Sequence, residues 1–170
     1  MVKLAALPPF QSLLDSHSGD VLGFLIAAVG PSDAEDCFQE TLVSALRAYP
    51  RLEDDRNLRG WLLTIAHRKA IDHHRARSRR PRPAGDATET EQLAGRRPGN
   101  TAGDPQAGLD GRPEIWGAVA TLPPKQRSAV ALRFACDLRH GEIATALGIS
   151  EDAARRNVHE GVKRLREVFA

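Results

Sequence analysis

The sequence predicts an all-α protein that consists of two small helical modules joined by a flexible linker. Apolar side chains recur with the 3.6-residue period of an α-helix over residues 10–80 and again over residues 114–169. Residues 81–113 between them hold five prolines and six glycines in 33 positions, and no aromatic, valine or isoleucine side chain. Such a segment cannot bury enough apolar surface to fold, so we expect a linker there. No segment of the chain requires a β-strand.

Composition is typical of a soluble folded protein. Apolar residues make up 41% and charged residues 27% of the 170 residues, which excludes wholesale disorder and allows one domain or two small ones. The apolar run over 4–7 is shorter than the core of a signal peptide, and no stretch of about 18 apolar residues occurs. We therefore expect the protein in the cytoplasm, without a membrane partner. Cys37 and Cys136 form no CxxC pair, so we expect two core thiols and neither a disulfide framework nor a zinc ribbon.

Three helices are expected in the first module. Apolar positions over 10–28 fit one helix or two short ones. Ser32 and Glu35 have the spacing of a capping box at the start of a second helix, which ends before the proline at position 50. A third helix should run over about 58–79.

The second module contains a helix-turn-helix pattern. A short helix around Val119 is followed by two prolines and by a helix that runs through Phe134. In the segment EIATALGIS, Gly148 supplies the left-handed conformation of the turn, and Ser150 caps the last helix. On that helix, apolar side chains recur at i, i+4, i+8, i+11 and i+15 from position 154 onward, so one face is buried and the reverse face is polar.

The net charge of +2 hides an uneven distribution along the chain. Lys and Arg counted against Asp and Glu give −4 for residues 1–50, +5 for 51–80, −1 for 81–113 and +2 for 114–170. An acidic segment followed by a basic one indicates two faces for two partners, the basic one for a polyanion such as nucleic acid. On the second helix, three carboxylates recur at i, i+3 and i+7 and lie on one face beside an amide. This face is either a binding surface for a partner or only a solvated surface. These residues are Asp33, Asp36, Gln39 and Glu40.

A strongly basic strip ends the expected third helix. Residues 67–80, HRKAIDHHRARSRR, carry six cationic side chains, three histidines and one aspartate. A solvated basic face, favoured by the helix macrodipole, is one interpretation, and contact with nucleic acid is the other. A tryptophan beside the strip could pack in the core, stack on an unpaired base, or do both. The residues that we expect to contact nucleic acid here are Trp61, His67, Arg68, Arg75 and Arg79.

The last helix is the expected recognition helix. If it docks in a major groove, its N-terminal half reads base edges, where arginine suits guanine and asparagine suits adenine. A purely structural helix pair is the alternative. The expected base readers are Arg155, Arg156, Asn157 and Glu160, and Lys163 and Arg164 should reach phosphates.

Signals for catalysis or metal binding are weak. The chain has no glycine-rich phosphate loop and no convincing grouping of Ser, His and Asp. The histidines at 67, 73 and 74 could meet Cys37 or Asp72, but their i+6 and i+7 spacings are poor for metal ligands. We expect no catalytic residue, no metal and no cofactor.

Four segments together resemble a known family. DAEDCFQET, RGWLLTIAHRKAID, LPPKQRSAVALRF and EIATALGIS follow one another in the order and spacing of bacterial extracytoplasmic-function (ECF) sigma factors. The resemblance covers nearly all of the chain outside the linker. Residues 10–80 resemble sigma region 2, and residues 114–169 resemble region 4. One departure is Arg68, which stands where the family commonly has an asparagine.

The resemblance implies a subunit without catalytic activity that joins core RNA polymerase and directs transcription initiation at promoter DNA. The acidic face on the second helix would bind the β′ clamp helices, and the β flap is a further expected contact. Region 2 would recognise and open the minus-10 element around Trp61, and region 4 would recognise the minus-35 element. An anti-sigma factor is the implied regulator. The alternative is a stand-alone helix-turn-helix regulator whose first module serves for dimerisation or sensing.

Overall fold

The computed structural model describes residues 7–79 and 113–170. In these residues the chain forms seven α-helices and one 3-10 turn and no strand, which confirms the predicted all-α class. None of the described helices is both long and apolar enough to cross a bilayer. The predicted linker lies outside the described residues except for its last residue. The elements are α1 (Phe10–Val29), α2 (Pro31–Ala48), η1 (Tyr49–Arg51), α3 (Leu58–Arg79), α4 (Pro113–Ala120), α5 (Pro124–Phe134), α6 (His140–Leu147) and α7 (Glu151–Val168).

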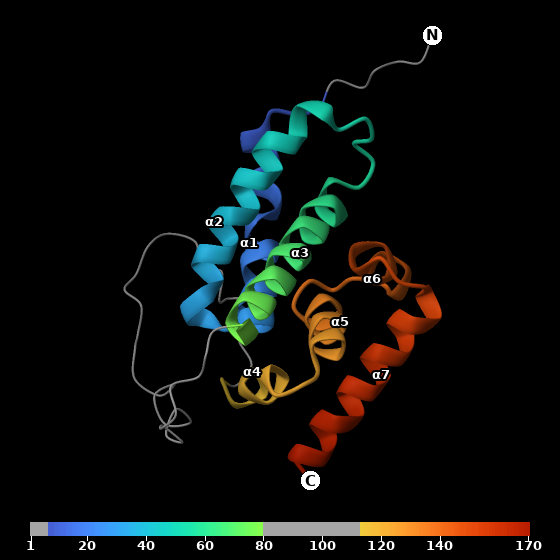
Figure 1. Cartoon of the computed structure of the whole chain (residues 1–170). Helices are drawn as coiled ribbons and strands as arrows, with labels where there is room; N and C mark the ends of the chain where they lie inside the picture. Colours follow the sequence, from blue (N-terminus) through green and yellow to red (C-terminus); the bar gives the residue numbers. More distant parts are fainter. Residues whose placement is uncertain (1–6, 80–112) are drawn as a thin grey trace.

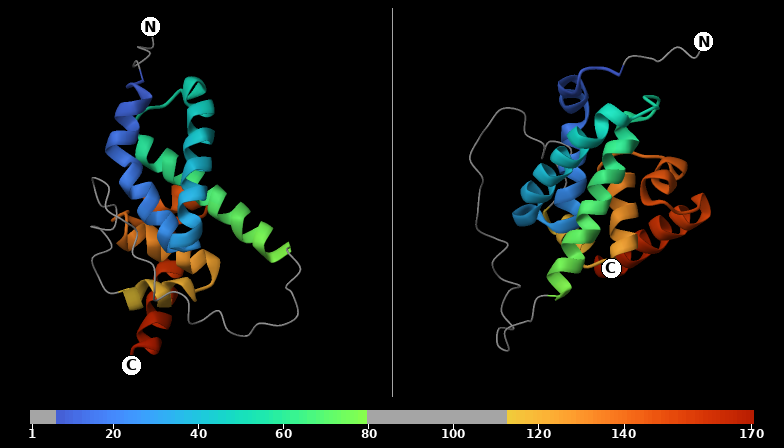
Figure 2. Two further views of the ribbon diagram at one scale, coloured as in Figure 1. Left: turned by 90° about the vertical axis from the view of Figure 1, so that its left-hand side faces the viewer. Right: turned by 45° about the horizontal axis from the view of Figure 1, so that its top comes forward.

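The helices pack in layers (Figure 1). Helices α1 and α3 lie in the middle, with α2 on one side and α5 and α6 on the other. The right-hand view in Figure 2 shows the same order, with α7 on the outer side of α5 and α6. The outermost helices, α2 and α7, are therefore the ones that carry the predicted acidic face and the predicted recognition surface.

Helices α1, α2 and α3 form a three-helix bundle around fully buried apolar side chains. Phe24 and Leu25 of α1 meet Leu62 and Leu63 of α3 in this core. Helix α1 is one helix of 20 residues rather than two short ones. The first module therefore has the three helices that its apolar periodicity predicts.

The start of α2 shows that the predicted capping box is wrong. Gly30 precedes the helix with a φ of 90°, Pro31 is the first helical residue, and Ser32 lies inside the first turn without capping it. Proline suits this position because its fixed φ is helical and its missing N–H has no partner there. Glycine suits the preceding position because the turn from α1 into α2 needs a positive φ.

Helix α6, the following turn and α7 form the predicted helix-turn-helix. Gly148 has φ 64° and ψ 38°, the left-handed conformation that glycine adopts most readily after a helix. The N–H of Ile149 donates to the carbonyl oxygen of Ala144 at 3.0 Å, which ends α6. The hydroxyl of Ser150 accepts a hydrogen bond from the N–H of Ala153 at 3.2 Å and so caps α7.

A glycine in the middle of α7 permits close packing against α5. A Cβ atom at Gly161 would lie 2.6 Å from Cγ2 of Val130 and 3.5 Å from Cβ of Gln126. Real Cβ atoms essentially never come as close as the first of these distances. The glycine lowers helix propensity by about 1 kcal/mol, and this close helix contact is the physical reason for its presence.

The two modules share one hydrophobic core. Leu132, Leu138 and Ile143 of the second module belong to the same buried cluster as Phe24 and Leu63 of the first. Helix α5 packs on α1, and α6 packs on α3. The sequence patterns predict the modules but not this packing, because periodicity shows which face of a helix is apolar and not which partner covers it.

Gly161→Ala should destabilise the protein despite the better helix propensity of alanine. The added methyl group would force Val130 to move, and overpacking a buried contact costs typically about 1–3 kcal/mol. We expect urea unfolding to show a free energy of unfolding about 1 kcal/mol lower than that of the unmodified protein. Gly19→Ala is the matched control and should stabilise, because nothing lies within 4 Å of a Cβ there. A Gly161→Ala variant as stable as Gly19→Ala would contradict the close contact.

Candidate protein and nucleic-acid interfaces

The outer face of α2 presents most of the predicted acidic residues to solvent. Asp36, Gln39 and Glu40 are exposed, and Glu40 makes only a long contact of 4.0 Å with Nζ of Lys69. Helix α2 itself lies on the opposite side of α1 and α3 from α5, α6 and α7 (Figure 1). The structure thus brings these three residues together on one accessible surface.

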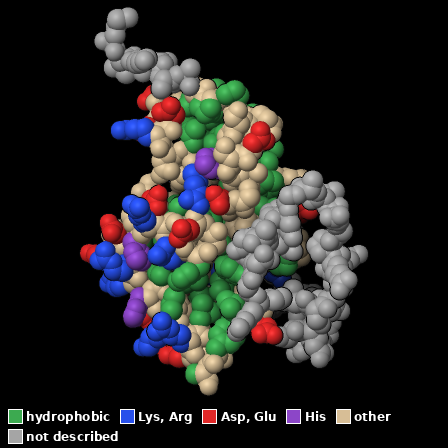
Figure 3. Space-filling model, turned by 180° about the vertical axis from the view of Figure 1, so that it is seen from behind, with side chains coloured by type: hydrophobic (Ala, Val, Ile, Leu, Met, Phe, Trp, Pro, Cys, Tyr) green, Lys and Arg blue, Asp and Glu red, His purple; other side chains and the backbone are tan. Residues whose placement is uncertain are grey.

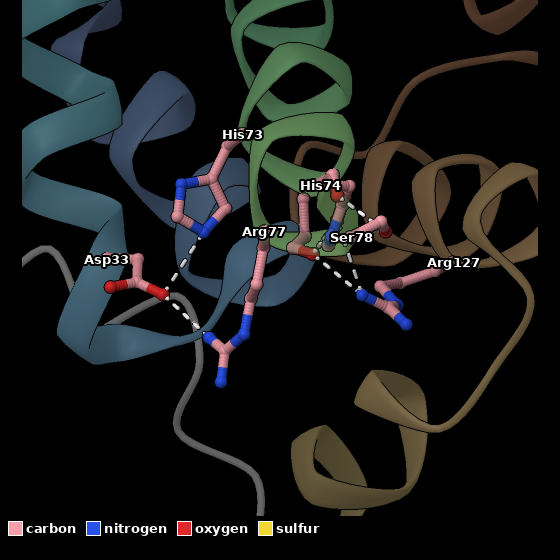
Figure 4. A network of polar contacts seen from close by, with 7 residues as sticks. Asp33, His73, His74, Arg77, Ser78 and Arg127 are labelled. Carbon is pink, nitrogen blue, oxygen red and sulfur yellow. Dashed lines mark hydrogen bonds and ion pairs between the residues drawn. The ribbon is translucent and has the colours of Figure 1, made fainter. Parts of the chain in front are cut away.

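Asp33 lies apart from this surface because α3 holds it. Its Oδ2 atom lies 3.1 Å from Nε2 of His73 and accepts a hydrogen bond from Nη1 of Arg77, also at 3.1 Å (Figure 4). The carboxylate is half-buried. Asp33 therefore ties the first turn of α2 to the C-terminal half of α3, and two residues of the basic strip serve this contact.

Two apolar side chains extend the acidic face. Val43 is 48% exposed and Leu46 is 55% exposed. They follow Gln39 at i+4 and i+7 and so continue its side of the helix. The charge pattern of α2 gives no sign of them, but their helical spacing from Gln39 does. The face thus combines carboxylates with exposed aliphatic groups.

The basic strip on α3 divides between two sides of the helix. Arg68, Arg75 and Arg79 are exposed, and none of them forms an ion pair with another described residue. Their i, i+7 and i+11 spacing places them on one side of the helix, as predicted from the sequence. Three guanidinium groups on α3 are therefore accessible to a binding partner.

His67 lies on a different side of α3 from these arginines. Its ring meets the ring of Phe24 edge-on, with 6.4 Å between centroids, and its Nδ1 atom is buried without a hydrogen-bond partner. Burial, with a smaller contribution from the charge of Arg68, lowers the pKa of His67 to about 4. The imidazole is therefore neutral near pH 7, and it lies half-buried against Phe24.

Trp61 is half-buried near the N-terminal end of α3. Its ring lies 6.0 Å from the ring of Tyr49, which also contacts Phe10 at 5.2 Å. The Tyr49 hydroxyl donates to the carbonyl oxygen of Pro8 at 2.6 Å and fixes this aromatic group. Trp61 therefore contributes to the core and retains an exposed part.

Helix α7 exposes most of the predicted base readers and phosphate contacts. Arg156, Glu160, Lys163 and Arg164 are exposed, and Asn157 is half-buried. Arg155 is also exposed, but its guanidinium lies 3.2 Å from Oε1 of Glu151 and 3.5 Å from Oδ1 of Asp152. On the face of the molecule seen in Figure 3, acidic and basic side chains lie interspersed.

Two family models match the chain, in the order that the sequence predicts. The model of Sigma-70 region 2 matches residues 13–80, and the model of Sigma-70 region 4 matches residues 112–165. The sigma factor CarQ of Myxococcus xanthus is 30% identical and aligns with 94% of this chain and 88% of its own length. The chain belongs to the family of ECF RNA polymerase sigma factors. Proteins of this family act in transcription initiation.

Further relatives and solved structures agree with this family. The ECF sigma factor SigL of Mycobacterium tuberculosis is 31% identical over 92% of this sigma factor and 86% of its own chain. ShbA of Streptomyces griseus is 33% identical, and the match covers 80% of this chain and 73% of the ShbA chain. The fold is that of the sigma factor RpoE of Bartonella quintana, solved with the anti-sigma factor NepR. That structure has a TM-score of 0.74 at 24% identity, with 94% of this chain and 96% of that chain covered.

Family membership also decides between the two functions considered from the sequence. A stand-alone regulator would need a sensor or dimerisation domain in the first module. That module instead matches sigma region 2, so the alternative is not favoured.

Acidification should destabilise this sigma factor through His67. Because the folded pKa of about 4 lies below the ordinary value of 6.5, the unfolded chain binds more protons between these pH values. The contribution of this group to stability is therefore complete above pH 6.5 and is lost as the pH falls toward 4. In His67→Gln, the loss of unfolding free energy between about pH 7.5 and about pH 5 should be smaller by about 1–2 kcal/mol. Chemical denaturation at both pH values measures it, with the exposed His159→Gln as control; equal losses in the two variants would contradict the assignment.

Proposed function

We propose that this sigma factor joins core RNA polymerase in the cytoplasm, directs it to promoters and helps to open the DNA, without catalysing a reaction itself. Residues 10–80 act as region 2, residues 114–169 act as region 4, and residues 81–113 connect them. One observation carries this proposal: an accessible acidic and apolar face on α2 is separate from two accessible basic surfaces, on α3 and on α7. A protein partner and a nucleic-acid partner can therefore bind at the same time.

The polymerase contact is the outer face of α2. Asp36, Gln39 and Glu40 supply charge and hydrogen-bond acceptors for a basic surface, expected on the β′ clamp helices. Val43 and Leu46 supply apolar area beside them. Such a mixture favours a stable interface, because complementary charge steers association and apolar burial slows dissociation. Asp33 supports this surface from behind through its contacts with α3.

The minus-10 contact is the exposed side of α3. Arg68, Arg75 and Arg79 neutralise backbone phosphates, and the exposed part of Trp61 stacks on an unpaired base. Separation of a base from its stack costs a few kcal/mol, which stacking and phosphate contacts offset without ATP. His67 helps indirectly, because its packing against Phe24 fixes the orientation of the helix.

The minus-35 contact is the N-terminal half of α7. Arg156, Asn157 and Glu160 are placed to read base edges, and Lys163 and Arg164 to reach phosphates. Arg155 joins them once DNA displaces Glu151 and Asp152 from its guanidinium. The β flap is a further expected contact of region 4.

An anti-sigma factor is the expected regulatory partner. The structure of the Bartonella quintana sigma factor holds an anti-sigma factor, and CnrH was solved with the cytosolic domain of CnrY. CnrH has a TM-score of 0.63 at 18% identity, with 94% of this chain and 86% of that chain covered. A shared fold supports a shared class of regulator for this chain.

Reconstituted transcription tests the function as a whole. Core RNA polymerase of the source organism and the purified protein should give run-off transcripts from genomic fragments, and the mapped start sites should share upstream elements. A mixture that neither assembles nor initiates would refute the proposal.

Asp36→Arg should weaken binding to core polymerase at least tenfold, because reversal of an exposed charge puts like charges face to face across the interface. Titration with purified core enzyme measures the affinity. Asp15→Arg is the matched control, since Asp15 is an exposed carboxylate on α1 whose one hydrogen bond among the described residues comes from the neighbouring Gln11. Equal affinities of the two variants would show that the α2 face is not the polymerase contact.

Arg68→Ala should reduce open-complex formation about tenfold and leave core binding within about twofold, because the exposed guanidinium contacts DNA rather than polymerase. Permanganate footprinting on a mapped promoter measures opening, and the same core titration measures assembly. Lys125→Ala, which removes an exposed cation from α5, is the control. A similar loss in both assays would contradict the assignment.

A further inference from the structure

The row of exposed arginines on α3 is interrupted by one carboxylate. Asp72 follows Arg68 by four residues and precedes Arg75 by three, so it lies on the same side of the helix as they do. Arg79 lies one further turn along this side. Asp72 is exposed, as the arginines are, and it is the one acidic residue of α3. The surface proposed to contact DNA therefore has a hydrogen-bond acceptor among its cations.

Ion pairing within α3 does not account for this carboxylate. The spacings from Asp72 to Arg68 and Arg75 are those at which charged side chains on a helix can meet. Asp72 nevertheless forms no ion pair with another described residue. By contrast, Arg77 on the neighbouring side of α3 is paired with Asp33 of α2 at 3.1 Å. The carboxylate oxygens of Asp72 are therefore accessible to an external partner.

The chemistry of a carboxylate limits what this partner can be. An ionised carboxylate accepts hydrogen bonds and donates none. Close to a backbone phosphate, it would place like charges face to face, which is unfavourable. Bases, in contrast, offer donors, because cytosine, adenine and guanine each carry an amino group, whereas thymine presents a carbonyl oxygen instead. On a surface that binds DNA, Asp72 therefore suits a base with an amino group and opposes both phosphate and thymine.

We propose that Asp72 is a specificity-determining residue for the minus-10 element, which selects a base that carries an amino group and rejects thymine. The inference rests on the proposed contact of α3 with DNA. Arg68 and Arg75 hold phosphates on either side, and the carboxylate between them accepts a hydrogen bond from the base. Asp72 follows Trp61 by 11 residues, or about 16 Å along the helix. This separation exceeds the roughly 3.4 Å between neighbouring nucleotides of a strand, so Asp72 and Trp61 contact different bases.

Binding of single-stranded DNA to the full chain tests the inference without knowledge of a promoter. Oligo-dC and oligo-dT of equal length carry the same phosphates and differ only in the base that they present at every position. Fluorescence anisotropy at low ionic strength gives the dissociation constant for each. In Asp72→Ala, the preference for oligo-dC over oligo-dT should fall about fivefold relative to the unmodified protein. This is the lower end of the range for one base contact, because Asp72 is exposed to water.

Further variants separate hydrogen bonding from charge. Asp72→Glu keeps the carboxylate and should retain most of the preference for oligo-dC. Asp72→Asn removes the charge and adds a donor, so it should lose the preference and bind oligo-dT more tightly than the unmodified protein does. Asp15→Ala is the matched control, because it removes an exposed carboxylate of α1 and should change neither dissociation constant by more than about twofold.

Three results would overturn the role of Asp72. The first is an unchanged preference in Asp72→Ala. The second is an equal rise in affinity for both oligonucleotides, which would show that Asp72 only repels phosphates. The third is a lack of binding of either oligonucleotide by the unmodified protein, which would also refute the contact of α3 with DNA.

The holoenzyme shows whether the same selection operates at a promoter. Each base of a mapped minus-10 element is replaced by thymine in turn, and run-off transcription is measured. One such replacement should reduce initiation about fivefold more with the unmodified protein than with Asp72→Ala. Equal losses at every position would overturn the inference and leave the proposed function intact, because the unmodified holoenzyme still initiates. Absence of initiation by the unmodified holoenzyme would refute the proposed function, and the oligonucleotide preference would still decide whether Asp72 selects a base.

Discussion

Helix α3 faces three different environments at once, and the positions of the other helices depend on how it does so. One side packs on α2, another packs on α1 and on region 4, and the third remains in solvent. Only the solvent side carries arginines that are free of described partners. A single helix therefore fixes the position of the acidic face, the surface on which region 4 packs, and the basic surface proposed to contact DNA.

The C-terminal half of α3 shows how polar groups replace apolar packing. Beyond Ile65 the apolar stripe fades in the sequence, yet the helix continues to Arg79. His73 and Arg77 bind Asp33 of α2, and His74 approaches the end of α1. Two helices that diverge from a common core can be held together in this way, because each contact satisfies a helix end or a half-buried carboxylate.

Local signals in the sequence were sufficient for much of the fold. Apolar periodicity predicted the first half of α3, and Gly148 with Ser150 predicted the helix-turn-helix, because these features depend on residues close together in the chain. The capping box at Ser32 failed because two local signals competed there, and the proline beside a glycine with positive φ determined where α2 begins.

Contacts between distant residues could not be predicted. Nothing in the spacing of HRKAIDHHRARSRR distinguishes Arg77, which binds Asp33, from Arg75, which pairs with no described carboxylate. His67 belongs to the same basic strip, but its place against Phe24 depends on how α1 crosses α3. The exposed Val43 and Leu46, in contrast, follow Gln39 at helical spacing, so their place on the outer face of α2 is predictable from residues close in the chain.

Nη1 of Arg127 on α5 donates to the carbonyl oxygen of Ala28 at 3.0 Å, two residues before the turn at Gly30. Without the guanidinium, the carbonyl oxygen of Ala28 would keep only its contact with Nε2 of His74, and the last turn of α1 would be held less firmly. The direction in which α2 leaves that turn is set by the same few peptide units. The contact of Arg127 on α5 thus lies at the same backbone turn from which α2, the helix proposed to bind polymerase, begins.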